Sequence, residues 1–443
     1  MKRRDLIKTG TAMAVGFSFP VLSHGKQLDT VSGGIYDQLM REMDSMDIID
    51  AHEHLIPEEK RISKQADVFT LFNHYVNCDL ISAGIDPEDL RLVFNSDLPL
   101  QERWQKLEYY WNQIKYSSYA KCTRITVEKL YGIDDINVNT IEEISAKVAN
   151  GNKPGLYQEI FDMCNIKYVI DQNGLTKMPD PIYSQMPLLQ GSSFMIFATK
   201  KRFDKMCKEF NMEVTSLGDC MKLLDKQLSA WKEQGVVSIK IRTAPNVEPN
   251  AIEAEKRLQE MLKAGDWHID NYQTMDPFNN YILHECMELA AEHDFVVSAH
   301  AGVWGDFRDM DSKDLLTLAI AHPETKYDLY HLGFPFIRDT IMIAKNNPNV
   351  YLNLCWTHIL SQTQTNSALR EIVDSVPLNK VSAFGGDFVG HVENIVGHLQ
   401  MAKEDFAEVF AEEIQRGRFD FHEAVGILKQ CFYDNPKNLY KLS

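Results

Sequence analysis

The sequence has eight cysteines but no C-x-x-C pair, and the eight are scattered along its 443 residues. Several of them, such as Cys286 and Cys355, lie within apolar or helical patterns. The spacing argues against a paired-cysteine zinc or redox motif, and in a chain of this length it favours buried thiols over a disulfide scaffold. One or two disulfides are an alternative, but the sequence does not show which cysteines would pair.

Basic side chains are outnumbered by acidic ones, 46 against 63, so the formal net charge is −17. Such a chain is not expected to bind nucleic acid or an anionic membrane surface. A small-molecule substrate, even an anionic one, stays open because the local charge of a site can oppose the net charge. After the N-terminus no apolar run approaches membrane-spanning length, and no internal repeat or low-complexity tract stands out. The sequence does not show the oligomeric state, and a homo-oligomer is one alternative.

The N-terminus has the pattern of an export signal. Residues 2–8 (KRRDLIK) resemble a twin-arginine signal, and an apolar segment follows from about Thr9 to Leu22. That segment has the length of a signal-peptide core and is too short to span a membrane. We therefore predict that residues 1–25 are a signal segment and that the protein is exported to the periplasm; a disordered basic terminus is the alternative. No Ala-x-Ala cleavage site is visible near Ser23 to Lys26.

Short apolar runs rich in β-branched residues alternate with helical patterns over the rest of the chain. Most runs are continuously apolar, as in parallel strands that are buried on both faces. Helical patterns such as 281–293, 311–321 and 336–345 fill the gaps. Eight such units predict an α/β fold, a (β/α)8 TIM barrel formed within residues 26–443. The predicted strands are 47–51, 167–171, 194–198, 236–241, 295–299, 327–330, 350–354 and 381–384.

The gap between the first two predicted strands is much longer than the others. About residues 56–155 have helical patterns and many aromatic residues, among them Trp104, Tyr109 and Trp111. We predict a helical insertion over the C-terminal mouth of the barrel, where strand-to-helix loops lie. Its aromatic residues either line a substrate pocket or, more commonly, form the core of a separately packed cap.

Side chains able to bind metal follow five of the eight predicted strands. His52 and His54 end the first, and because alternate residues of a strand point to one face, their imidazoles converge. The strand ends of a barrel face its active site, so the other positions join them there. Taken singly, each residue has an ordinary explanation, such as a core histidine or a lysine lying along apolar surface; taken jointly they predict a metal site. The set is His52, His54, Lys240, His300, His331 and Asp387.

This order of residues resembles the amidohydrolase superfamily, specifically the amidohydrolase 2 group. His300-Ala301-Gly302 and residues 331–336 (HLGFPF) are similar to phrases of that group. So are residues 348–352 (PNVYL) and 434–440 (DNPKNLY). The resemblance covers nearly all of the mature chain and is strongest from Val236 onward. Residues 69–75 (FTLFNHY) in the insertion are similar to uronate isomerases, a branch of the same superfamily.

The resemblance implies that His52, His54 and Asp387 hold a divalent metal, usually Zn²⁺. In members with a complete set, Lys240 is carbamylated and bridges two metals, and His300 and His331 bind the second. In single-metal members His300 joins the first three ligands, His331 polarises the substrate carbonyl and Lys240 contacts substrate. A bound Zn²⁺ lowers the pKa of its water to about 7. Asp387 then accepts that water's proton and delivers it to the leaving group.

Three further residues are candidate substrate ligands. Trp304 and Arg308 lie in the loop after the fifth strand, and Trp356 lies just past the seventh. The planar guanidinium of Arg308 suits a carboxylate, although a surface arginine paired with a neighbouring aspartate is equally expected.

The leading prediction is therefore a metal-dependent hydrolase acting on a small amide, ester or lactone. Lys240 and His331 favour hydrolysis, whereas the helical insertion favours the first alternative, uronate isomerisation. A decarboxylase and a non-catalytic sugar-acid binding protein are further alternatives, because a fold does not fix a reaction.

Overall fold

The computed structural model describes residues 32–172, 183–185, 197–269, 275–303 and 306–442. The predicted signal segment, residues 1–25, lies outside the described residues, and so does Trp304. Across the described part of the chain, no helix is both long and apolar enough to cross a membrane.

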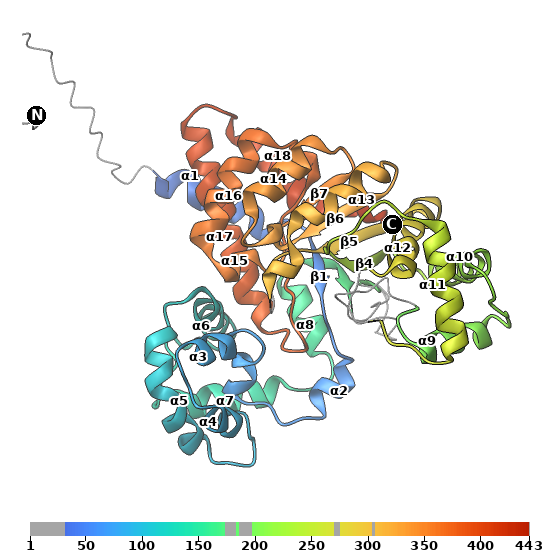
Figure 1. The fold of residues 1–443 in the computed structure, drawn as a ribbon. Coiled ribbons are helices and arrows are strands. Elements are labelled where there is room, and N and C mark those ends of the chain that lie inside the picture. The colour runs from blue at the N-terminus through green and yellow to red at the C-terminus, as the bar shows by residue number, and fades with distance from the viewer. Residues whose placement is uncertain (1–31, 173–182, 186–196, 270–274, 304–305, 443) are drawn as a thin grey trace, which may run out of the picture.

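The described strands form a (β/α)8 barrel with helices around it (Figure 1). One run of strands has the order β1-β2-β3 and the other the order β4-β5-β6-β7-β8, and adjacent strands within each run pair in parallel. The end of β8 meets β1, where the Ala51 amide donates to the Phe384 carbonyl at 3.0 Å. The strands are β1 Ile48–Glu53, β2 Ile166–Asp171, β3 Tyr183–Gln185, β4 Ser238–Arg242, β5 Val296–His300, β6 Lys326–Tyr330, β7 Val350–Asn353 and β8 Val381–Ser382.

Seven of these strands fall on the predicted runs, and the third does not. The prediction was 194–198, of which 194–196 lie outside the described residues, while Phe197 and Ala198 form a turn. Phe197 is buried, and its carbonyl accepts a hydrogen bond from the Trp267 indole at 2.9 Å. Phe197 therefore packs beside the barrel, and the third described strand lies upstream, at Tyr183–Gln185.

Helices with one apolar face surround the strands. In α10 (Leu217–Glu233), Ser216 caps the N-terminus, and buried apolar residues recur at helical spacing from Leu217 to Trp231. The other outer helices are α9 Lys200–Glu209, α11 Ala251–Ala264, α12 Pro277–Glu292, α13 Leu315–Ala321, α14 Ile337–Asn346, α15 Thr357–Leu360, α16 Gln362–Ser375, α17 Asn394–Gln415 and α18 Phe421–Lys429. At the two ends of the described chain lie α1 Ser32–Asp44 and α19 Asn435–Tyr440.

The segment between β1 and β2 is helical and forms a lobe beside the barrel (Figure 1). The lobe has an apolar core of its own, in which the rings of Phe72 and Trp111 stack at 4.9 Å. Trp104 is also in this core, so most of the lobe's aromatic residues serve its own packing, whereas Tyr109 is 68% exposed. Its elements are α2 Glu58–Ile62, the 3₁₀ helix η1 Val68–Phe72, α3 Val76–Ser82, α4 Pro87–Val93, α5 Leu100–Ile114, α6 Ser118–Tyr131 and α7 Ile141–Gly151; α8 Leu156–Met163 leads into β2.

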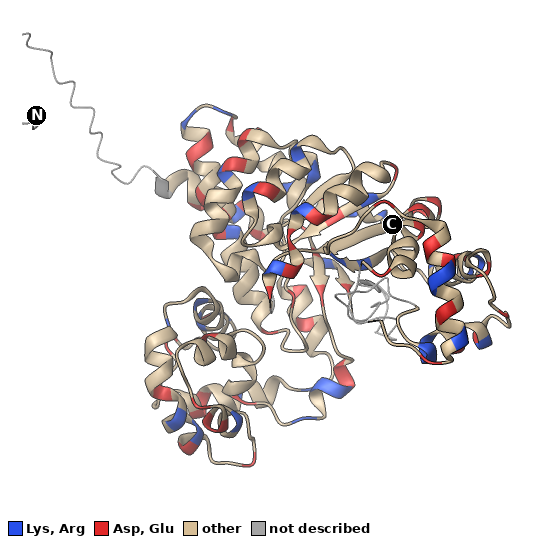
Figure 2. Cartoon of the chain, viewed as in Figure 1, with Lys and Arg blue, Asp and Glu red and all other residues tan. Residues whose placement is uncertain are grey.

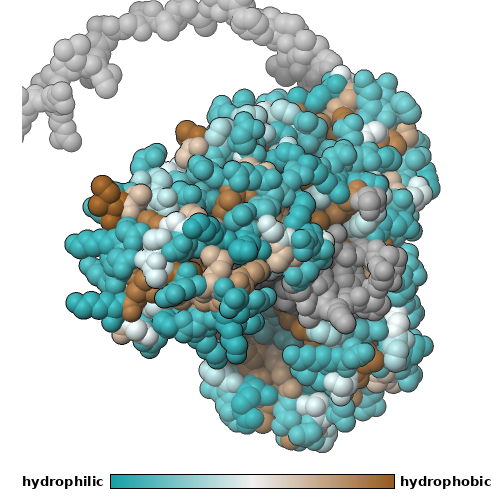
Figure 3. All heavy atoms as spheres, turned by 90° about the vertical axis from the view of Figure 1, so that its right-hand side faces the viewer, coloured by the Kyte–Doolittle hydropathy of each residue, from teal (hydrophilic) through white to brown (hydrophobic). Residues whose placement is uncertain are grey.

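Charged residues of both signs lie along the outer helices. Figure 2 shows acidic and basic residues interspersed there. On the face drawn in Figure 3, hydrophilic residues predominate and hydrophobic ones are scattered in small groups.

Candidate metal centre

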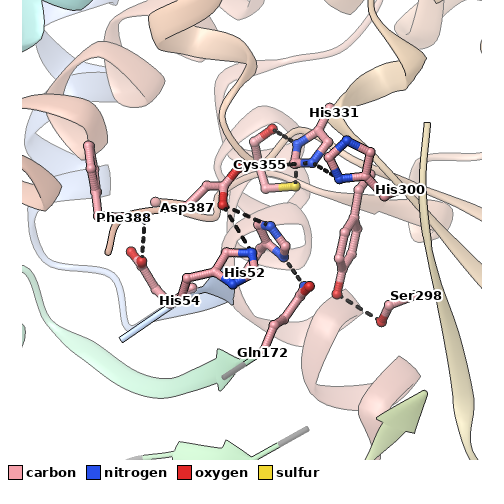
Figure 4. A network of polar contacts seen from close by, with 12 residues as sticks. His52, His54, Gln172, Ser298, His300, His331, Cys355, Asp387 and Phe388 are labelled. Atoms are coloured by element: carbon pink, nitrogen blue, oxygen red, sulfur yellow. Dashed lines mark hydrogen bonds and ion pairs between the residues drawn. The ribbon is translucent and has the colours of Figure 1, made fainter. Parts of the chain in front are cut away.

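Strand β1 and the segment after β8 bring three potential ligands together. Nε2 of His52 lies 3.1 Å from Oδ1 of Asp387, and Nε2 of His54 lies 3.5 Å from the same oxygen (Figure 4). The ligand atoms of this trio all lie within 4.8 Å of one another. His52 is fully buried, whereas the side chain of His54 is 25% exposed, so the trio is reachable from one side.

The backbone after β8 is held against β1 and the helical lobe. The Asp387 amide donates to the His52 carbonyl at 2.9 Å, and the Tyr75 hydroxyl donates to the Asp387 carbonyl. Gly386 has no room for a side chain, because an added Cβ would lie 1.9 Å from Oε1 of Glu53. These contacts fix the Asp387 carboxylate opposite the two imidazoles.

His300 and His331 form the other half of the cluster. Nε2 of His331 lies 3.2 Å from Nδ1 of His300 and 4.0 Å from Oδ2 of Asp387. Nδ1 of His331 lies 3.1 Å from the carbonyl oxygen of Cys355, to which it can only donate. The neutral ring therefore keeps its lone pair on Nε2, the nitrogen that faces His300 and Asp387.

Lys240 reaches the centre through Gln172. The Lys240 ammonium donates to the Gln172 amide oxygen, and the amide nitrogen contacts Nδ1 of His52. If Nε2 of His52 coordinates a cation, Nδ1 keeps its hydrogen and needs an acceptor. The Gln172 amide must then turn its oxygen towards His52, so that its NH₂ group faces Lys240. Because an NH₂ group donates, the Lys240 side chain must offer a lone pair to accept from it.

Burial sets the charges of this cluster. It lowers the pKa of His52 and of His300 well below the ordinary value, and that of His331 to about 4. Burial alone would raise the pKa of Asp387, but its histidine neighbours outweigh this and hold it well below its usual range. Neutral imidazoles with lone pairs thus face a carboxylate. Such a donor set can bind a divalent cation.

The six predicted ligands therefore lie in one connected cluster. Trp356 borders it, with its ring 5.2 Å from that of His331. Arg308 lies instead on the 3₁₀ helix Phe307–Met310, where its side chain is 80% exposed and paired with Asp306. This is the surface arginine–aspartate pair that was the alternative to substrate binding. A role for Arg308 in substrate binding stays a prediction.

Sequence reasoning missed several residues of the site. Gln172 directly follows β2 and Cys355 follows β7 by two residues, so the strand-end rule that selected the histidines would also have selected them. Tyr75 was noted only as part of a motif. His358, on α15 after β7, is not available to the centre, because both of its ring nitrogens are used, on Asp405 at 2.8 Å and on the Ala383 carbonyl at 3.0 Å.

Comparisons with known proteins agree with this geometry. A family model described as amidohydrolase matches residues 217–442, just over half of the chain. A 131-residue stretch is 25% identical to the fluG protein of Emericella nidulans, and it covers 29% of this chain but only 15% of that protein. The present chain thus spans a small part of that relative.

Solved structures share the fold at low sequence identity. A uronate isomerase of Thermotoga maritima has a TM-score of 0.72 at 15% identity, over 92% of this chain and 97% of its own. A glucuronate isomerase of Caulobacter crescentus has a TM-score of 0.73 at 16% identity, over 94% and 95%. A protein of Lactobacillus casei provisionally assigned as a metal-dependent hydrolase has a TM-score of 0.61 at 15% identity, over 91% and 97%.

Proposed function

This chain belongs to the amidohydrolase family, and we propose that it is an exported metal-dependent hydrolase that cleaves a small amide, ester or lactone. The observation that carries the proposal is the convergence of His52, His54 and Asp387, with 3.1 and 3.5 Å between the imidazole nitrogens and one carboxylate oxygen. Two imidazoles and a carboxylate with an open side are typical of a catalytic rather than a structural zinc site.

The ligands and their chemistry follow from the donor set. His52, His54 and Asp387 would hold the first cation, for which we propose Zn²⁺. A cation bound there supplies Lewis acidity to a substrate carbonyl and to water at neutral pH. Asp387 keeps its second oxygen, Oδ2, free to accept a proton from water and to return it to the leaving atom. The lone pair on Nε2 of His331 favours a ligand role for this residue over polarisation of a carbonyl.

Lys240 is suited to carbamylation. Burial lowers its pKa to about 7, so much of it is neutral at slightly alkaline pH, and only a neutral amine reacts with CO₂. A carbamate would also accept the hydrogen bond from Gln172 once that amide has turned towards His52. We propose that a carbamylated Lys240 bridges a second cation held by His300 and His331. A ¹³C signal from protein equilibrated with ¹³CO₂, absent in Lys240→Met, tests this step.

Uronate isomerisation is the second candidate. The structures of two such isomerases share this fold, and the helical lobe contacts the centre directly through the hydrogen bond from Tyr75 to Asp387. The set of Lys240, His300 and His331 beside the first three ligands favours hydrolysis, since it can hold a second cation.

Metal analysis together with substrate screening tests the proposal. One or two equivalents of zinc per chain are expected, and activity should appear with lactones, esters or amides. Protein that binds no divalent metal at all would refute the hydrolase. Turnover of a uronate without any hydrolysis would favour the isomerase.

Export is proposed from residues 2–8 alone and has its own test. The chain should appear in the periplasmic fraction of a bacterium with a twin-arginine pathway. A variant with Arg3→Lys and Arg4→Lys should stay in the cytoplasm, and equal export of both would refute the signal.

A further inference from the structure

Cys355 adds a sulfur to the cluster. It lies between β7 and α15, is fully buried, and its Sγ is 3.3 Å from Nδ1 of His331. Figure 4 shows the sulfur pointing into the space between His331 and the pair of His52 and Asp387. Ligand atoms of His52, His331 and Cys355 all lie within 4.8 Å of one another.

The backbone around Cys355 is held in place on every side. Its amide donates to Oδ1 of Asn353 at 2.9 Å, and the next amide, of Trp356, donates to the Gly385 carbonyl at 3.0 Å. Gly385 separates Cys355 from His52: an added Cβ would lie 2.5 Å from the Cβ of Cys355 and 2.9 Å from that of His52. The absence of a side chain at this position brings the thiol and the imidazole together.

The histidines give an independent indication of a ligand. His52 has no exposed surface, yet its Nε2 has no hydrogen-bond partner and faces an oxygen of Asp387 at 3.1 Å. His331, also fully buried, donates its ring hydrogen from Nδ1 to the Cys355 carbonyl. Nε2 of His52, Nε2 of His331 and the sulfur therefore belong to one buried cluster, a set of donors that a soft or borderline cation can bind.

A buried thiol commonly serves only as a small apolar side chain, as Cys286 does inside α12. Cys355 differs in its neighbours. In the described part of the chain, it is the cysteine that belongs to a group of metal-capable side chains, and Cys286 belongs to none.

We infer that Cys355 is a thiolate ligand of a cation held jointly with His52 and His331. The inference rests on the proposed metal-dependent function and applies to the centre with one cation bound, because His52 and His331 belong to different cations in the form with two. On binding, the S–H bond breaks, its proton leaves to solvent, and sulfur donates a lone pair to the cation. The ligand atoms must close to roughly 3.3–3.8 Å, the separations that tetrahedral Zn–N and Zn–S bonds impose.

A sulfur ligand narrows the choice of metal. Thiolates select Zn²⁺, Co²⁺ or Fe²⁺, whereas Mg²⁺ and Mn²⁺ prefer oxygen ligands. The chain should therefore bind Zn²⁺ and Co²⁺ in preference to Mn²⁺, and this preference should depend on residue 355.

Cobalt spectroscopy of the full chain tests the inference without an activity assay. Apo protein is titrated with Co²⁺, and sulfur-to-cobalt charge-transfer absorption in the near ultraviolet is recorded for the wild type, Cys355→Ser and the buried control Cys286→Ser. The band should appear in the wild type and the control and be absent in Cys355→Ser. Zn²⁺ affinity of Cys355→Ser should fall at least about tenfold, the lower end of the cost of losing even an outer partner of a ligand.

X-ray absorption at the zinc edge of the wild-type protein gives a second readout that no folding defect of a variant can obscure. One sulfur at about 2.3 Å is expected. Bound Co²⁺ or Zn²⁺ without any sulfur signal would overturn the thiolate and leave the hydrolase standing. A charge-transfer band that persists in Cys355→Ser would show that another residue supplies the sulfur, and would also overturn the inference. Failure to bind either cation would overturn both proposals.

Discussion

The carboxyl groups of Asp50 and Glu53 lie together without any exposed surface, directly behind the two histidines of β1. The Gly386 amide donates to Oδ1 of Asp50 at 3.0 Å and the Phe388 amide donates to Oε2 of Glu53 at 2.6 Å. The remaining two oxygens have no partner other than each other, so a proton must lie between them. The pair therefore attaches the segment that carries Asp387 to the strand that carries His52 and His54.

This pair should make stability depend on pH. Burial raises the pKa of Asp50 to about 7 and that of Glu53 well above its usual value. Acids with raised pKa values stabilise the folded state fully below their unfolded pKa, near 4, and lose that contribution as pH rises through the folded pKa. In Glu53→Gln an amide hydrogen replaces the shared proton. Between about pH 5 and 8, the free energy of unfolding of Glu53→Gln should rise relative to that of the wild type, by at most about 1.4 kcal/mol per pH unit.

Urea unfolding at several pH values measures the difference, with the exposed Glu102→Gln as control. A constant gap between Glu53→Gln and the wild type at all pH values would contradict the shared proton.

Replacing Asp387 with Asn should reduce turnover at least about 100-fold while the fold persists, because an amide cannot accept the proton of water. The amide is also a weaker ligand, so the assay is run at saturating Zn²⁺ with bound metal measured alongside. Asp37→Asn, at an exposed position of α1, is the matched control. Retained turnover in metal-loaded Asp387→Asn would show that Asp387 does not transfer the proton.

Gln172 should control metal affinity through the tautomer of His52. Gln172→Leu leaves Nδ1 of His52 and the amine of Lys240 without their shared partner, and zinc affinity should fall about 10- to 100-fold. In Gln172→Glu a carboxylate still accepts from Nδ1 of His52, so zinc affinity should stay above that of Gln172→Leu. Competition with a chelator measures both constants. Equal affinities of the two variants would show that the residue only fills space.

Tyr75→Phe should weaken the attachment of the helical lobe to the centre. The change removes the hydroxyl that donates to the Asp387 carbonyl and leaves that buried oxygen unpaired, at a cost of about 1–3 kcal/mol. Chemical denaturation and turnover are both measured, with Tyr109→Phe, 68% exposed on α5, as the control. Unchanged stability and turnover in Tyr75→Phe would mean that the lobe is held by its other contacts.

The sequence was most informative where one physical rule applied repeatedly. Continuous apolar runs located seven of the eight strands, because strands of a parallel barrel are buried on both faces. In the described part of the third predicted run the rule failed, because Phe197 and Ala198 form a turn, and it overlooked Tyr183–Gln185, which is short and polar.

The strand-end rule could have placed Gln172 and Cys355 near the predicted ligands, but it could not have shown which ligand each one contacts. Gln172 contacts His52 from 120 positions away, and Cys355 contacts His331 from 24 positions away. These pairings depend on the strand register and on side-chain packing. The hydrogen that decides which nitrogen of His331 faces Asp387 likewise depends on the Cys355 carbonyl, a backbone atom that no motif records.

The junction of β8 with β1 joins segments that lie far apart in the sequence, since Phe388 and Glu53 are bonded across 335 positions. His52 and His54 leave the ribosome long before Asp387, so a nascent chain lacks the carboxylate of the trio until β8 and the segment after it have been made. Binding of a cation by all three ligands must therefore follow synthesis of this segment. Any truncation before β8 yields a polypeptide that lacks the carboxylate, however well its remaining strands fold.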